Sequence, residues 1–275
     1  MKGELYLTRH RTPDGVRWAV NGRWLPRHVN LSLILQLPAE RLPVVLEALA
    51  EEEEAQGELL APVDPTQEVW AAGVTYLRSR AAREAESVAA DVYQRVYEAA
   101  RPELFLKAVG WRVVGPDQAI RVRRDSAWNV PEPEVTLVIN RDLEIVGYTL
   151  GNDVSSRSIE GENPLYLPQA KIYRGACALG PGILFTTLDV LRELEVGLTV
   201  RRDGKVIFEE TCSTAQMKRS FEELVHYLGR ELDFPEGVLL MTGTGIVPPD
   251  DFSLQPGDVV TISADGLALE NRVGL

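Results

Sequence analysis

Pro131-Glu132-Pro133-Glu134 opens the stretch that decides the fold of this chain, and it leads directly into the apolar run Val135 to Ile139. Alternate residues of a strand point to the same face, so Glu132 and Glu134 would present two carboxylates side by side if both enter this strand. Two like charges in that position repel each other unless a cation or hydrogen-bond donors lie between them. The stretch therefore predicts a strand whose entrance needs such a partner.

A third carboxylate, Asp153, follows a second apolar run, Glu144 to Leu150, which could return antiparallel beside the first. Three carboxylates suit a hard divalent cation, Mg²⁺ or Mn²⁺, with positions left for water or substrate. The same spacing also fits a solvated strand end with unrelated acids. For Lys171, which comes soon afterwards, the residues alone favour a salt bridge to the surplus carboxylates.

Length and composition fit a globular protein of 275 residues, with 45% hydrophobic and 25% charged residues. The formal net charge is −12, which argues against nucleic acid and anionic membrane surfaces as partners. A small anionic substrate would need a local cation to hold it, and a bound metal would serve. We expect one large domain, or one domain with a small appendage.

The N-terminal residues contain no apolar leader, and no stretch approaches membrane-spanning length. The two cysteines, Cys177 and Cys212, fit neither a disulfide framework nor a zinc pattern. A cytoplasmic location is the expectation. The three histidines lie outside the acidic stretch, so an imidazole base is not indicated there.

Residues 1–64 are predicted to form a small α/β domain. Asn21-Gly22 indicates a tight hairpin turn, and a helix is expected from about Ala39 until the acidic run Glu51 to Glu54. That run is typical of a solvated helix face rather than a metal site. Pro62-Val63-Asp64-Pro65 is a plausible linker to a second, larger domain, residues 65–275.

The second segment reads as strands with a few helices, which predicts an α+β domain. Residues 151–182 break every long period except near Lys171, and a long irregular segment inside a compact domain is usually functional. Ser213 and Gln216 have the spacing of a capping box that would open a helix carrying Phe221 to Leu232 in its core stripe.

A glycine-rich segment, Met241-Thr242-Gly243-Thr244-Gly245, follows another apolar run. It lacks the third glycine and the helix start of a dinucleotide-binding loop, because Pro248-Pro249 occupies that place. Its backbone N–H groups would still be able to hold a carboxylate.

Taken together, these motifs resemble the fumarylacetoacetate hydrolase superfamily from about Val69 to the C-terminus. The resemblance implies a mixed β-sandwich roll with flanking helices, in which Glu132, Glu134 and Asp153 bind Mg²⁺. The matching pieces are Gly73-Val74-Thr75-Tyr76, Pro131-Glu132-Pro133-Glu134, Gly151-Asn152-Asp153-Val154-Ser155-Ser156-Arg157, Lys171, Gly180-Pro181 and Thr242-Gly243-Thr244.

Within that superfamily, the segment from Ile159 to Gln169 looks most like the 2-keto-3-deoxy-D-arabinonate dehydratase branch. The resemblance implies a hydro-lyase of pentose and sugar-acid metabolism that yields 2-oxoglutarate semialdehyde through a metal-stabilised enolate. It implies a base role for Lys171 and an acid/base role for Glu103. A homodimer or homotetramer acting on a small 2-keto acid is expected. Substrate contacts are expected from Arg157, Gln169, Tyr173, Thr242, Gly243, Thr244 and Ser79.

Three alternative functions stay open at this point. The hydrolases of this superfamily carry a water-activating His where this chain has Ser79, which argues against a C–C hydrolase of acylpyruvates. An oxaloacetate-type decarboxylase would use the same enolate chemistry without that His. A non-catalytic binding protein is disfavoured by the retained Glu103 and Lys171.

Overall fold

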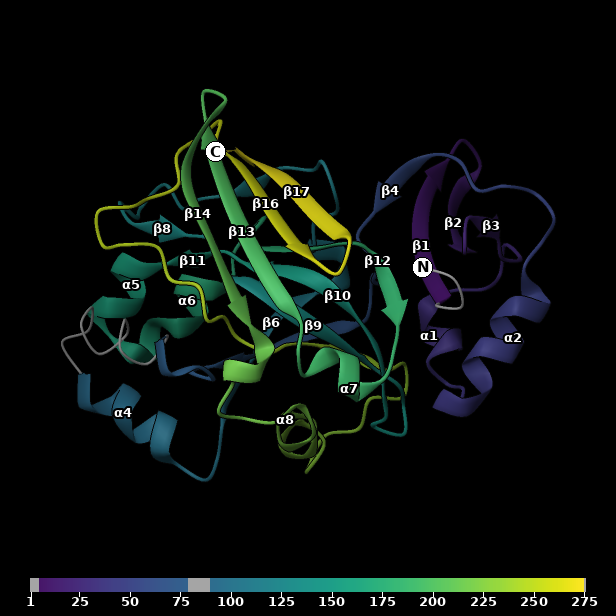
Figure 1. Ribbon diagram of the computed structural model, residues 1–275, viewed down its shortest axis with the longest axis horizontal. Coiled ribbons are helices and arrows are strands. Elements are labelled where there is room, and N and C mark those ends of the chain that lie inside the picture. Colours follow the sequence, from purple (N-terminus) through teal and green to yellow (C-terminus); the bar gives the residue numbers. More distant parts are fainter. Residues whose placement is uncertain (1–4, 79–89, 275) are drawn as a thin grey trace.

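Two β-sheets packed face to face form the body of the protein (Figure 1). The computed structural model describes residues 5–78 and 90–274. The larger sheet has ten strands in the order β3-β2-β1-β12-β10-β9-β15-β5-β6, with β4 paired to β1. Its strands are β1 (Leu5–Thr12), β2 (Gly15–Val20), β3 (Arg23–Trp24), β4 (Glu58–Leu60), β5 (Glu68–Gly73), β6 (Glu103–Val109), β9 (Pro133–Ile139), β10 (Ile145–Asp153), β12 (Cys177–Phe185) and β15 (Val238–Met241).

The smaller sheet has five strands in the order β14-β13-β16-β17-β7 and lies across one face of the larger one. A further pair, β8 with β11, lies beside the ends of β9 and β10. These strands are β7 (Ile120–Arg121), β8 (Asn129–Val130), β11 (Ser155–Ser156), β13 (Glu195–Arg202), β14 (Lys205–Ser213), β16 (Val259–Ala264) and β17 (Leu267–Gly274). The mixed sheets with few helices confirm the predicted α+β fold class.

Helices close the edges of the sheets. Helix α8 packs its apolar stripe into the core between the sheets, and α1 and α2 cover the opposite face of the larger sheet. No helix within the described ranges is long and apolar enough to cross a membrane. The α-helices are α1 (Leu31–Ile34), α2 (Leu42–Leu49), α4 (Ala90–Glu98), α5 (Arg157–Glu162), α6 (Leu167–Lys171), α7 (Leu188–Leu191) and α8 (Phe221–Leu228); 3₁₀ turns span Ala39–Arg41, Gly110–Arg112, Pro164–Tyr166 and Thr214–Gln216.

Strand β9 lies in the middle of the core because every one of its residues is buried. Leu137 and Ile139 contact the cluster between the two sheets, whereas Val138 contacts the cluster under α1 and α2. Burial on both faces explains why the sequence from Val135 to Ile139 is continuously apolar rather than alternating. Its neighbour β10 runs antiparallel, as expected, with Gly151 opposite Glu134.

The N-terminal hairpin and helix form where the sequence indicates them, but the acidic run Glu51 to Glu54 follows the helix instead of forming its solvated face. Asn21 and Gly22 form the turn between β2 and β3 with positive φ angles of 48° and 75°, and α2 ends just before the acidic run that begins at Glu51. Strand β1 pairs with β12 and thereby joins the larger sheet. The division of the chain at residue 64 stays a prediction.

Two further local expectations were wrong. Residues 151–182 are not irregular, because they contain the end of β10, helices α5 and α6, and the first part of β12. These short elements fall below the length at which periodicity is recognisable. Ser213 caps only a 3₁₀ turn, whereas α8 begins at Phe221 with Ser220 as its cap and Glu223 three residues later. The true capping pair therefore lies seven residues further along.

Candidate metal centre and active site

Glu132, Glu134 and Asp153 meet where β9 begins and β10 ends. Each of the three carboxylates offers an oxygen, and these oxygens lie within 4.8 Å of one another. All three residues are buried, with at most 4% of their surface exposed. The antiparallel register is closed at this end by the Asp153 N–H, which donates to the Glu132 carbonyl at 3.0 Å. Strand pairing thus gathers the predicted triad at one point.

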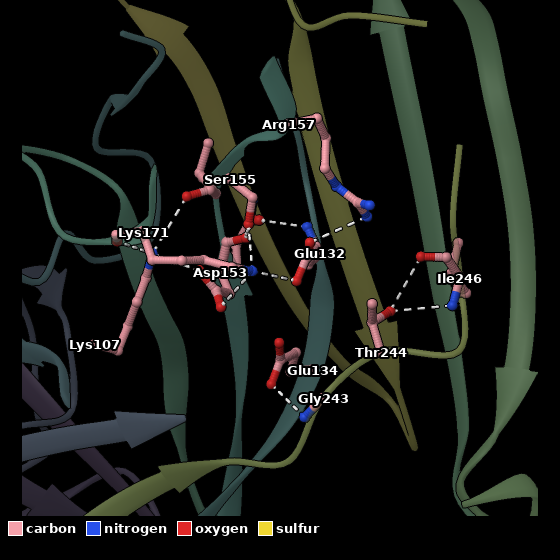
Figure 2. A network of polar contacts seen from close by, with 12 residues as sticks. Lys107, Glu132, Glu134, Asp153, Ser155, Arg157, Lys171, Gly243, Thr244 and Ile246 are labelled. Atoms are coloured by element: carbon pink, nitrogen blue, oxygen red, sulfur yellow. Dashed lines mark hydrogen bonds and ion pairs between the residues drawn. The ribbon is translucent and has the colours of Figure 1, made fainter. Parts of the chain in front are cut away.

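Cationic side chains surround part of the triad (Figure 2). Lys171 Nζ lies 2.8 Å from Glu132 Oε2 and 3.1 Å from Asp153 Oδ2, and it donates to Ser155 Oγ at 2.6 Å. Arg157 contacts the other oxygen of Glu132 at 3.2 Å. The salt bridges that the residues alone favoured for Lys171 are therefore present.

Lys107 is a second buried lysine in the cluster. Its Nζ lies 2.5 Å from Asp153 Oδ1, and it also donates to the main-chain carbonyls of Val154 and Lys171. The two lysines hold opposite oxygens of Asp153. Lys107 is additionally fixed to the backbone, whereas the described partners of the Lys171 amine are side-chain oxygens.

Glu134 is the carboxylate of the triad that the cations do not reach. In the part of the chain that the structure describes it makes no ion pair, and its Oε2 accepts from the Gly243 N–H at 2.5 Å. Burial, followed by the charges of Asp153 and Glu132, raises the pKa of Glu134 well above the ordinary carboxyl range. A divalent cation at the meeting point of the three carboxylates would remove this strain, so the all-oxygen donor set fits Mg²⁺.

The glycine-rich loop after β15 is held by a tight brace. Thr75 Oγ1 donates to the Thr242 carbonyl at 2.7 Å, and Thr242 Oγ1 donates to the Val135 carbonyl at 2.8 Å. Gly243 has φ +88°, and a Cβ there would lie 2.0 Å from Thr75 Oγ1. Val74 is held at φ 54°, a conformation that a β-branched residue rarely adopts. Such strain is common where a backbone must present groups to a ligand.

A cavity opens above the triad. Its wall includes five of the predicted site residues outside the triad: Glu103, Arg157, Lys171, Gly243 and Thr244. Among the described residues, the lining is Ala72, Gly73, Val74, Glu103, Phe105, Glu132, Glu134, Asp153, Arg157, Glu160, Leu167, Lys171, Gly243 and Thr244. The side chain of Glu103 lies over Gly73, where a Cβ would meet its Oε2 at 2.0 Å.

Other predicted contacts lie away from this cavity. Gln169 is exposed, and its carbonyl accepts from Arg123 at 2.9 Å. Tyr173 packs its ring beneath Arg123 and lines a separate cleft beside Trp111. Thr242 braces the loop from below the cavity. The roles of these residues as substrate contacts stay predictions, and Ser79 lies outside the described residues.

Lys107, Ser155 and Glu160 are site residues that sequence reasoning missed. For Lys107 a signal existed, because Glu103, Phe105 and Lys107 alternate along β6 and therefore share a face. Glu160 follows Arg157 by three residues, which places both on one face of α5. Ser155 carries no recognisable signal of its own, since buried serines are common in loops.

Comparison with known proteins agrees with this geometry. Residues 68–274 match the family model described as fumarylacetoacetate (FAA) hydrolase C-terminal. The chain is 54% identical over 215 residues to a probable 2-keto-3-deoxyxylonate dehydratase of Haloferax volcanii, which covers 77% of this chain and 73% of the relative. It is 44% identical over 213 residues to 2-dehydro-3-deoxy-D-arabinonate dehydratase of Saccharolobus solfataricus, covering 75% of this chain and 70% of the relative.

A solved structure extends the likeness to almost the full length. It is titled 2-keto-3-deoxy-D-arabinonate dehydratase complexed with magnesium and 2,5-dioxopentanoate. The two chains superpose with a TM-score of 0.83 at 33% identity, and the match covers 98% of each.

Proposed function

The chain belongs to the fumarylacetoacetate hydrolase family, and from that premise we propose that it is a magnesium-dependent dehydratase of 2-keto-3-deoxy sugar acids. This hydro-lyase converts 2-keto-3-deoxy-D-arabinonate to 2-oxoglutarate semialdehyde, which is 2,5-dioxopentanoate. The observation that carries the proposal is the buried triad of carboxylates, faced by Lys171, in a chain similar to two dehydratases of such acids.

The names of the two relatives point to one kind of substrate. A 2-keto-3-deoxypentonate keeps a single stereocentre, at C4, because the ketone and the methylene remove those at C2 and C3. D-Arabinonate and D-xylonate therefore give the same 2-keto-3-deoxy acid. The parent sugar acids named for the two relatives do not imply different requirements for the cavity.

Glu132, Glu134 and Asp153 are the residues that would hold Mg²⁺. When bound, the ion supplies Lewis-acid polarisation of the 2-keto group, which acidifies the C3 protons. The raised pKa of Glu134 supports this assignment, because a buried carboxyl group is costly to ionise unless a cation lies against it.

Lys171 and Glu103 are the proposed acid–base groups. Lys171 Nζ lies within 3.1 Å of both Glu132 and Asp153, so it would face the carbon next to a keto group held at the triad and take the C3 proton. Glu103 stands in the same cavity and would protonate the C4 hydroxyl, because hydroxide is a poor leaving group.

A turnover assay tests this function. The protein is incubated with Mg²⁺ and, separately, with 2-keto-3-deoxypentonates and hexonates, acylpyruvates and oxaloacetate, and the products are identified by mass. We expect 2-keto-3-deoxy-D-arabinonate to yield a product lighter by one water, and Glu103→Gln to lose most of the rate. Efficient cleavage of acylpyruvates with no dehydration of any 2-keto-3-deoxy acid would overturn the proposal.

We also propose that the protein is a cytoplasmic homodimer or homotetramer. The exposed ring of Trp111, 68% accessible, lies beside a cleft whose wall includes Arg112, Arg121 and Arg174. Tryptophan and arginine are enriched in subunit contacts, so this surface supports self-association. Sedimentation of wild type and Trp111→Glu tests it: a lower mass for the variant is expected, and a monomeric wild type contradicts it.

A further inference from the structure

The proposed reaction needs more proton transfers than one base and one acid provide. Loss of the C3 proton and the C4 hydroxyl gives 5-hydroxy-2-oxopent-3-enoate. The aldehyde of 2-oxoglutarate semialdehyde lies at C5, so a C5 proton must then be removed and C4 must gain one. This inference rests on the proposed function. It concerns the group of the cavity that removes the C5 proton.

Among the described residues of the cavity wall, Glu160 is the one carboxylate besides Glu103 and the triad. It lies on helix α5, whose burial alternates sharply along its six residues. Arg157 and Glu160, three residues apart, are 2% and 3% exposed, whereas Ser158 and Glu162 are exposed. The helix therefore presents Arg157 and Glu160 to the cavity and Glu162 to solvent.

Burial of the Glu160 carboxylate at this place has a cost, which charged or polar groups around it must offset. A carboxylate taken out of water loses hydration that only charged or polar partners restore, and an apolar residue would fill the same space on a buried helix face. The cap of α5 at Ser156, which accepts from the Ile159 N–H, fixes the helix independently of Glu160. Helix α5 therefore does not need Glu160 as a cap, and Glu160 is a buried carboxyl group on the wall of the cavity.

We propose that Glu160 is the group that moves a proton from C5 to C4 in the second half of the reaction. Its carboxylate takes a proton from C5, which is acidic because the C3=C4 double bond connects it to the ketone. The electron pair shifts to form C4=C5 and C2=C3, and Lys171 returns to C3 the proton that it took in the elimination. Glu160 then delivers its proton to C4.

The cycle closes without any other reactant. Glu103 donates a proton to the C4 hydroxyl, which leaves as water, and Glu103 recovers a proton from the C5 hydroxyl as the aldehyde forms. Lys171 and Glu160 each return the proton that they took. The sum is the loss of one water from the 2-keto-3-deoxypentonate, so every residue ends in its starting protonation state.

The elimination of water and the later proton transfer from C5 to C4 are separated by supplying synthetic 5-hydroxy-2-oxopent-3-enoate as substrate. Wild type, Glu160→Gln and the matched control Glu162→Gln, which changes the exposed glutamate of the same helix, are compared with Mg²⁺ present. We expect Glu160→Gln to convert the enone about 100-fold more slowly than wild type, the usual range for a lost acid–base group. Glu162→Gln should match wild type.

The full reaction gives an independent readout. With 2-keto-3-deoxy-D-arabinonate, Glu160→Gln should release the enone instead of the semialdehyde, whereas a variant damaged only in structure would slow both equally. If Glu160→Gln is insoluble, Glu160→Asp takes its place and should convert the enone more slowly than wild type and Glu162→Gln. Semialdehyde formation by Glu160→Gln at the wild-type rate, or enone release by Glu103→Gln alone, overturns the inference. A wild type that dehydrates no such acid defeats the proposed function instead.

Discussion

The two ends of the β9–β10 hairpin are both polar and buried, yet they are built differently. At the turn, Asn140 is fully buried and every group of its side chain is used: Oδ1 accepts from the N–H groups of Asp142 and Glu144, and Nδ2 donates to the Leu37 carbonyl and to Glu144. At the open end, three buried carboxylates meet, and Glu134 has no ion pair among the described residues.

This difference distinguishes the polar groups that stabilise the hairpin from those that serve its chemistry. Satisfied neutral groups stabilise a fold because breaking them leaves buried donors and acceptors without partners. A buried charge without an opposite charge beside it lowers stability, and such charges cluster at functional sites. We therefore expect changes at the turn to affect stability and changes at the open end to affect chemistry.

The largest effect on Mg²⁺ binding and turnover is expected from Glu134→Gln, at the open end of the hairpin. This change removes one of the three proposed metal ligands, so metal-dependent turnover should be largely lost and the Mg²⁺ affinity measured by calorimetry should fall. The metal-free variant should unfold at the same temperature as wild type or higher, because a buried repulsive charge is gone. Wild-type Mg²⁺ affinity in Glu134→Gln would contradict the ligand assignment.

Lys107→Met tests whether Lys107 holds Asp153 in place at the open end of the hairpin. Removing the amine frees Asp153 Oδ1 and the Lys171 carbonyl, and loss of such a supporting partner typically costs about 10–100-fold in metal affinity or activity. Calorimetry with Mg²⁺ and the rate at saturating Mg²⁺ measure both effects. Lys205→Met, at an exposed position, is the matched control and should behave as wild type. Unchanged affinity and rate in Lys107→Met would mean that Asp153 is held without it.

Asn140→Ala tests the turn. Loss of its hydrogen bonds should lower the free energy of unfolding by about 2–3 kcal/mol, because buried partners are left unsatisfied. Urea unfolding followed by fluorescence measures this change. The kcat of the folded enzyme should be unaffected, so a stable Asn140→Ala protein with reduced kcat would show that the two ends are not independent.

The smallest expected effect concerns pH. A carboxyl whose pKa is raised in the folded state binds more protons there than in the unfolded chain, so its contribution to stability falls as pH rises from the ordinary value of 4.5 through the raised one. The Tm of the metal-free protein should fall as pH rises through that window, and added Mg²⁺ should raise the Tm more at the higher pH. Glu134→Gln should show a flatter profile, and an equal slope in both proteins would contradict this origin.

The triad was predictable because its three residues lie in neighbouring stretches of the sequence with a recognisable strand pattern. Glu132 and Glu134 share a face by strand periodicity, and Asp153 follows the only apolar run near enough to return beside them. The family resemblance then indicated the metal. The membership of the cavity depended instead on packing between distant elements, which is why Lys107 on β6 was not identified as part of the site.

Nearness to Lys171 in sequence was a weak guide to the rest of the site. Gln169 lies two residues before it on α6, and helical residues two apart point about 200° away from each other, so Gln169 is exposed where Lys171 is buried. The same rule separates Glu160 from Glu162 on α5. Helices this short carry too few residues for their buried face to be read from the sequence.

Exchange of the C3 protons of a 2-keto acid with solvent is the most direct test of Lys171 as the base. Wild type and Lys171→Met are incubated with Mg²⁺ and pyruvate in deuterated water, and loss of the C3 proton signal is followed by NMR. Wild type should exchange these protons, and Lys171→Met should bind Mg²⁺ and pyruvate by calorimetry without exchanging them. Exchange at the wild-type rate in Lys171→Met would contradict the assignment of Lys171 as the base of this metal centre.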